Sequence, residues 1–142
     1  MIRVLVFILF FPFIAVAGNE ASIDTDVREV WSGGYWSYGD QDGVYRFIVR
    51  GGGIEHYKTK LYVQWLTVGT DYDKPILLKS VSIKELNDTP EYSFGLPECI
   101  GESRCSSVSL DATNTYDQSK YMIQIHMPNI GVYQYESAAA PL

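Results

Sequence analysis

Short runs of alternating hydrophobic and polar residues, separated by turn residues, cover the chain from position 28 to position 136. In one such run, Tyr45, Phe47 and Val49 alternate with a second, more mixed set of positions. Because side chains two positions apart lie on the same face of a strand, each run predicts a strand with one buried face. The predicted strands are Glu29–Tyr38, Val44–Arg50, Lys60–Val68, Ile76–Leu86, Ser107–Thr115, Tyr121–Met127 and Gly131–Tyr135.

The segments between these runs are typical of turns in an antiparallel protein. Asp42 and Gly43 form a dipeptide that favours a tight hairpin turn, and the glycines at 51–53 indicate a flexible connection. Helical periodicity is nowhere sustained over ten residues, and the nearest candidate is Ser82–Asn87. Seven or eight strands in about 110 residues predict an all-β antiparallel sandwich, immunoglobulin-like or jelly-roll-like, with a small β-barrel as the alternative.

The N-terminal segment has the pattern of a secretory signal. One positive charge at Arg3 precedes the apolar stretch Val4–Val16, and residues 15–17 have the small-x-small form of a cleavage site. We therefore expect a signal peptide over 1–17, with an uncleaved anchor as the alternative. The remaining boundaries that we predict are a lead-in over 18–27, one β domain over 28–136 and a flexible tail over 137–142.

Setting the signal aside changes the composition of the chain. The whole chain has a net charge of -6, and residues 18–142 hold 10 basic and 17 acidic side chains, which makes -7. This balance disfavours nucleic acid and anionic lipid as partners, because both require clustered cations. Export followed by release predicts a periplasmic or secreted protein. A single domain of this length can bury about two-thirds of the surface that its unfolded chain exposes.

Two cysteines, Cys99 and Cys105, follow the signal segment. An even number of cysteines in an exported chain predicts a disulfide, here one that closes a small loop. A metal pair and a redox pair are the alternatives. A zinc site normally takes four ligands and a redox pair is usually C-x-x-C, so the spacing favours the disulfide.

The aromatic residues give the one compositional hint of function. Four of the six Phe belong to the signal segment, whereas all eleven Tyr and three Trp follow it. Trp31, Tyr35, Trp36 and Tyr38 are the densest group. Strand alternation predicts that Trp31 shares a face with Tyr35, and that Trp36 shares the other face with Tyr38. One pair is expected in the core, and the other either covers its rim or forms a platform for a glycan or a protein partner.

Other motifs carry little chemistry. The glycines at 51–53 lack the Lys-Ser/Thr and the helix of a phosphate loop. The acidic group Asp40-Gln41-Asp42-Gly43 resembles part of a calcium loop, but its flanking ligand positions fail, and a hairpin turn explains it better. Asp71 and Asp73 form a second acidic pair, and His56 with His126 offers weak evidence for zinc. We expect no metal and no cofactor. Asn87 begins an N-x-T acceptor sequence for glycosylation.

Part of the chain resembles a known group of proteins. The segments that carry the likeness are Gly34–Trp36, Gly43–Val49, Gly52–His56 and Leu61–Leu66. Together they are similar to small exported proteins of unknown function in Gram-negative bacteria, over about Trp31 to Leu86. The resemblance implies a periplasmic or secreted bacterial location. It implies no activity, ligand or site residues.

Three functions fit this sequence. The favoured one is a non-catalytic binding module that uses the Trp31–Tyr38 segment to hold a protein or a glycan. The second is a small hydrolase with dispersed acids and a histidine, His56 or His126, in a cleft. The third is a structural subunit that pairs through an exposed sheet edge. Because the chain lacks a G-x-S-x-G or H-E-x-x-H motif, the sequence favours a protein that is not an enzyme. Its oligomeric state is left open.

Overall fold

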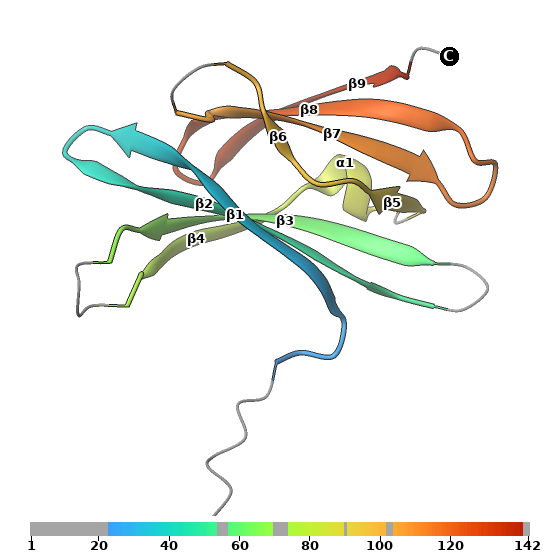
Figure 1. The fold of residues 1–142 in the computed structure, drawn as a ribbon, viewed down its shortest axis with the longest axis horizontal. Coiled ribbons are helices and arrows are strands. Elements are labelled where there is room, and N and C mark those ends of the chain that lie inside the picture. The colour runs from blue at the N-terminus through green and yellow to red at the C-terminus, as the bar shows by residue number, and fades with distance from the viewer. Residues whose placement is uncertain (1–22, 54–56, 70–73, 90, 102–103, 141–142) are drawn as a thin grey trace, which may run out of the picture.

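Two antiparallel sheets face each other in a computed structural model that describes residues 23–53, 57–69, 74–89, 91–101 and 104–140 (Figure 1). Sheet A contains four strands in chain order, β1 (Val27–Tyr38), β2 (Gln41–Gly52), β3 (Lys58–Thr67) and β4 (Leu77–Ser82). Each strand pairs antiparallel with the next. The chain completes this sheet before it enters the second one.

Sheet B contains five strands, two of which are very short. They are β5 (Tyr92–Phe94), β6 (Glu98–Cys99), β7 (Ser107–Asn114), β8 (Lys120–Asn129) and β9 (Val132–Ala139). The order is β5-β7-β8-β9, and β6 also pairs with β7. The predicted all-β sandwich is confirmed, as an open arrangement of two sheets. Since all strands of sheet A precede all strands of sheet B, the described chain does not pass back and forth between the sheets as a Greek key does.

The core lies between the sheets and consists of the faces that strand alternation predicts. These side chains are at most 7% exposed, and they are Tyr45, Phe47, Val49, Leu61, Val63 and Trp65 from sheet A and Val108, Leu110, Ala112, Ile123, Ile125 and Met127 from sheet B. Burial of this apolar area is the main source of stability for such a fold.

A single turn of helix, α1 (Lys84–Asn87), lies between the two sheets in the chain (Figure 1). A buried amide side chain fixes it. Asn87 is 8% exposed. Its Oδ1 accepts from the Leu61 backbone N–H at 2.7 Å, and its Nδ2 donates to the Leu61 carbonyl at 2.8 Å and to Ser82 Oγ at 2.7 Å. Because this amide nitrogen is engaged inside the protein, the predicted glycosylation acceptor is inaccessible in the fold.

We expect Asn87→Ala to lower the free energy of unfolding by about 1–3 kcal/mol, because the buried N–H of Leu61 would lose its partner and the Leu61 C=O would keep only the N–H of Ile83. Denaturant titration followed by circular dichroism would measure the change. Asp88→Ala is the control, since the neighbouring Asp88 side chain is exposed and should change stability by less than about 0.5 kcal/mol. Equal effects of the two substitutions would contradict this role of Asn87.

The first hairpin turns earlier than the sequence predicts. The turn lies at Gly39-Asp40, with Gly39 at φ +59°, and Asp42 and Gly43 already belong to β2. The prediction of a turn at Asp42-Gly43 is therefore wrong. Gly43 is instead a buried strand residue opposite Trp36, and a Cβ there would lie 2.6 Å from Cε2 of the indole. The glycine is needed for packing space.

Two other boundaries differ from the predictions. Gly51 and Gly52 belong to β2 and pair with Thr59 and Lys58, so only the end of the glycine run falls outside the strand. At the C-terminus, β9 continues to Ala139, so that part of the expected tail pairs with β8. Among the described residues, no helix has the length and apolar character needed to cross a membrane.

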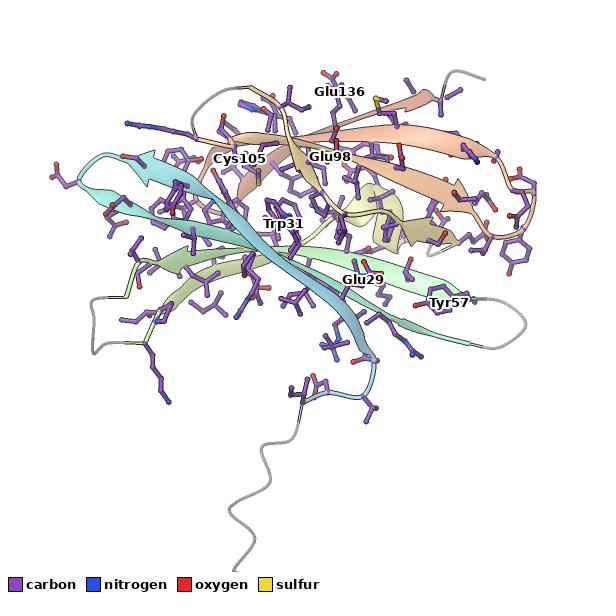
Figure 2. All side chains as sticks on the ribbon, viewed as in Figure 1. Glu29, Trp31, Tyr57, Glu98, Cys105 and Glu136 are labelled. Carbon is purple, nitrogen blue, oxygen red and sulfur yellow. A yellow bond between two sulfur atoms is a disulfide. The ribbon has the colours of Figure 1, made fainter. Side chains whose placement is uncertain are left out.

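The predicted disulfide is confirmed. Cys99 and Cys105 are bonded, with their Cα atoms 4.9 Å apart. The bond links β6 to the residue segment that precedes β7, and Cys105, labelled in Figure 2, is 6% exposed and belongs to the core. A bond of this kind is typical of an oxidising compartment outside the cytoplasm.

Candidate functional site

The four aromatic residues predicted as a ligand platform are divided between the core and the surface by a β-bulge in β1. The register of β1 against β2 shifts at Gly34, so that Gly33 faces Tyr45 but Tyr35 faces Val44. Gly34 is the extra residue and has φ +73°. An inserted residue of this kind reverses which side chains point inward beyond it.

Three of the four aromatic side chains consequently face the core. Trp31 packs edge-to-face on Phe47, with ring centroids 5.3 Å apart, and lies against the core between the two layers (Figure 2). Trp36 is 2% exposed and stacks on Tyr38 at 5.8 Å. Tyr35, by contrast, is 63% exposed. The prediction that Trp31 shares a face with Tyr35 is wrong, whereas the shared face of Trp36 and Tyr38 is confirmed and is the inner one.

Hydrogen bonds satisfy the polar atoms of Trp36, Tyr38 and Tyr45 in this core, whereas the buried indole Nε1 of Trp65 has no hydrogen-bond partner in the described part of the chain. The Trp36 indole N–H donates to the Val44 carbonyl at 3.1 Å. The Tyr38 hydroxyl lies 2.8 Å from the Tyr45 hydroxyl and donates to the Met127 carbonyl in the opposite sheet. Buried polar groups need such partners. Burial, together with the hydrogen bond that Tyr45 donates to the Tyr38 hydroxyl oxygen, raises the pKa of Tyr45 far above its ordinary value.

The exposed side of sheet A carries apolar side chains on all four strands, in two rows. In one row Val30, Ile48 and Tyr62 are cross-strand neighbours. The other row crosses from Tyr35 on β1 to Leu77 on β4. We call these side chains the sheet A surface, and its members are Val30, Tyr35, Val44, Ile48, Tyr62, Leu66 and Leu77. Val30, Tyr35 and Leu77 are 54%, 63% and 47% exposed.

A polar row separates the two apolar rows of the sheet A surface. Arg46 Nε donates to Gln64 Oε1 at 2.7 Å, and Gln64 Nε2 donates to Ser80 Oγ at 3.2 Å. Leu66 is only 6% exposed although it is not part of the core cluster between the sheets, because its neighbours on the outer face cover it. The surface is therefore an ordered, open face with apolar contact area on both sides of a hydrogen-bonded band.

The sequence contained a signal for this surface. Ile48 and Tyr62 occupy positions in their predicted strands that alternation assigns to the polar face. A large apolar residue on such a face is either covered by a neighbour or available to a partner.

The outer face of sheet B is polar and contains a small hollow of about 250 Å³. Ser107, His126 and Glu136 line it together with neutral amides, and Ser107 Oγ lies 2.8 Å from His126 Nδ1. His126 is exposed, as its strand position predicts. The hollow contains one histidine and one acid, and no acidic side chain in the described part of the chain bonds to that histidine. His56 lies outside the described residues.

No metal centre is formed by the residues that the structure describes, since no group of three or more His, Cys, Asp or Glu side chains is close enough to hold an ion. Asp40 and Asp42 lie at the first hairpin, and Asp40 is in its turn. The second acidic pair that the sequence suggested, Asp71 and Asp73, lies outside the described residues.

Comparison with known proteins finds no family model, no curated protein and no solved structure that matches the chain.

Proposed function

We propose that the protein is an exported, non-catalytic binding module whose partner protein packs on the sheet A surface. The observation that carries the proposal is the exposure of large apolar side chains on an outer sheet face, among them Val30 and Tyr35. Soluble domains rarely leave contiguous apolar area uncovered, and such area usually belongs to an interaction site. Tyrosine is enriched at interfaces, with aliphatic neighbours completing the contact.

The mixture of side chains favours a protein partner over a glycan. A sugar ring stacks on an aromatic face, whereas most members of the sheet A surface are aliphatic. Tyr35 and Tyr62 still support a glycan as the second candidate ligand. The disulfide between Cys99 and Cys105 supports the export part of the proposal, because such bonds persist in oxidising compartments.

Assembly through a sheet edge has independent support from β9. In the described part of the chain β9 pairs with β8 alone, and its eight residues contain a single charged side chain, Glu136. Edge strands of this length are usually interrupted by charges or bulges. By contrast, the outer edge of β1 is broken by two register shifts, and β4 presents Lys79.

The test of the binding proposal is the double substitution Val30→Ser with Tyr35→Ser. We expect this variant to fold with a change in stability of less than about 1 kcal/mol, because both side chains are exposed, and to lose its partner. Periplasmic pull-down and a glycan array, each run with wild type and variant, would measure the loss. Sedimentation at several protein concentrations would test assembly in the same samples.

Met122→Ser is the matched control, because Met122 is 38% exposed on the outer face of sheet B. A partner that binds both variants as it binds wild type would exclude the sheet A surface. A partner lost from both variants would indicate a general effect on the protein rather than a contact at this surface.

A further inference from the structure

A cationic hollow lies at the end of sheet A that contains the last residues of β2 and the first residues of β3. Tyr57, which precedes β3, is labelled at this end of the sheet in Figure 2. The volume of the hollow is about 640 Å³, and its lining consists of Asp26, Arg50, Gly51, Gly52, Lys58, Lys60 and Tyr62. Three of the chain's 11 basic residues thus meet at one place in a protein whose net charge is -6. The local charge is opposite to that of the whole chain.

Strand register brings these cations together on the outer face. Arg50 is the cross-strand partner of Lys60, and Gly52 is the partner of Lys58. Partners across an antiparallel pair share a face, as do residues two apart on one strand. Like charges placed directly opposite each other are destabilising. The arrangement therefore reduces stability to the extent that no anion, either a carboxylate of the protein or a bound ligand, offsets the cations.

The protein's own carboxylates compensate only one of these cations. Arg50 Nη2 pairs with Asp26 at 2.8 Å and with Asp24 at 3.1 Å, and Arg50 Nε donates to Asp26 at 3.0 Å. The guanidinium of Arg50 lowers the pKa of the Asp26 carboxyl. Within the described residues, Lys58 and Lys60 form no ion pair, and Arg50 Nη1 makes no hydrogen bond. Two positive charges and a guanidinium nitrogen remain available.

The floor of the hollow is open at Gly52, which has no side chain to fill it. A Cβ added to Gly52 would have a single neighbour within 4 Å, Arg28 Nη2 at 3.5 Å, so the outward space at this position is unfilled. Tyr62, a member of the sheet A surface, closes one side with its phenol ring. A ligand can thus approach the backbone between the two ammonium groups and the phenol.

We propose that this hollow binds the phosphate group of a soluble phosphate monoester. A phosphate monoester carries a charge of about -1.5 to -2 at neutral pH. Four cations lie at the hollow, because Arg28 Nη2 borders Gly52, and the two carboxylates that pair with Arg50 reduce this to a net charge of +2, which a phosphate matches. A carboxylate would leave one positive charge unmatched. Lysine ammonium groups bind phosphate as point charges, and the remaining Arg50 nitrogen adds a directional donor. The proposal is independent of the binding surface above, because it requires neither Val30 nor Tyr35.

The test is calorimetric titration of the full chain with inorganic phosphate, glucose 6-phosphate and glucose at low ionic strength. We expect both phosphates to bind, glucose not to bind, and added salt to weaken binding through screening. The variant Lys58→Gln with Lys60→Gln should bind phosphate at least tenfold more weakly. Its thermal stability without ligand should equal or exceed that of wild type, because the repulsion between the cations is relieved.

The matched control is Lys79→Gln with Lys120→Gln, which changes the net charge equally at positions outside the hollow. It should bind phosphate as wild type does. A second variant, Gly52→Leu, fills the floor and should abolish binding while the protein remains folded. Equal weakening in both lysine pairs would overturn the proposal, since the effect would then be one of overall charge. Absence of wild-type binding at about 10 mM phosphate would also overturn it, because a Kd above that range corresponds to less than about 3 kcal/mol.

Discussion

Trp36→Ala should lower the free energy of unfolding by about 3–5 kcal/mol, the range for truncating a large buried aromatic side chain. The indole is 2% exposed, stacks on Tyr38 and donates a hydrogen bond to Val44. Its removal leaves a cavity and a carbonyl without that donor. Urea denaturation followed by circular dichroism is the suitable measurement, because the substitution itself alters the fluorescence.

Tyr35→Ala is the control for this prediction, because it lies next to Trp36 in sequence and on the opposite face of β1. Tyr35 is 63% exposed, and its truncation should change stability by less than about 0.5 kcal/mol. If Trp36→Ala does not fold, Trp36→Phe retains most of the volume and should still be clearly less stable than Tyr35→Ala. A larger loss at Tyr35 than at Trp36 would mean that the faces of β1 are assigned the wrong way round.

The inner faces of the long strands could be predicted from sequence because they depend on local alternation alone. The period of two in segments such as Val44–Arg50 and Lys60–Val68 identifies a buried face wherever the strand is regular. The disulfide could also be predicted from the sequence, because an export signal together with an even number of cysteines is enough to predict it. The short strands β5 and β6 were missed because two or three residues contain no periodicity.

The candidate site was harder to predict because it depends on irregular geometry and distant contacts. Gly33 and Gly34 are adjacent, and the sequence does not show which of them a bulge would use, or that β1 has one. The hydrogen bond from Tyr38 to Met127 joins residues 89 positions apart, so the burial of Tyr38 follows from the packing of the two sheets. Lys58 and Lys60 of the cationic hollow are two positions apart in the sequence, which predicts a shared strand face. The negative net charge of the whole chain gave no indication of a local cationic site.

Gly34→Ala should lower the free energy of unfolding by at least about 3 kcal/mol, because backbone strain and overpacking act together there. Gly34 has φ +73°, a conformation that costs an L-residue about 1–2 kcal/mol. The new Cβ would also contact the Cβ of Cys105 and would lie 2.9 Å from its sulfur. Neither atom can retreat easily, because Cys105 is buried and held by the disulfide. Overpacking of this kind adds about 1–3 kcal/mol.

Gly39→Ala separates the two causes, because Gly39 has a similar φ of +59° but no atom within 4 Å of the added Cβ. Gly39→Ala should lower the free energy of unfolding by about 1–2 kcal/mol, which is the cost of the left-handed backbone conformation alone. Introducing Gly34→Ala into a Cys99→Ser, Cys105→Gly background should recover about 1 kcal/mol or more of the loss, since the obstructing atoms are then gone. If Gly34→Ala and Gly39→Ala lower the free energy of unfolding equally, then Gly34 is not tightly packed against Cys105 of the disulfide. The division of the four aromatic residues between core and surface would then need another cause than the position of Gly34.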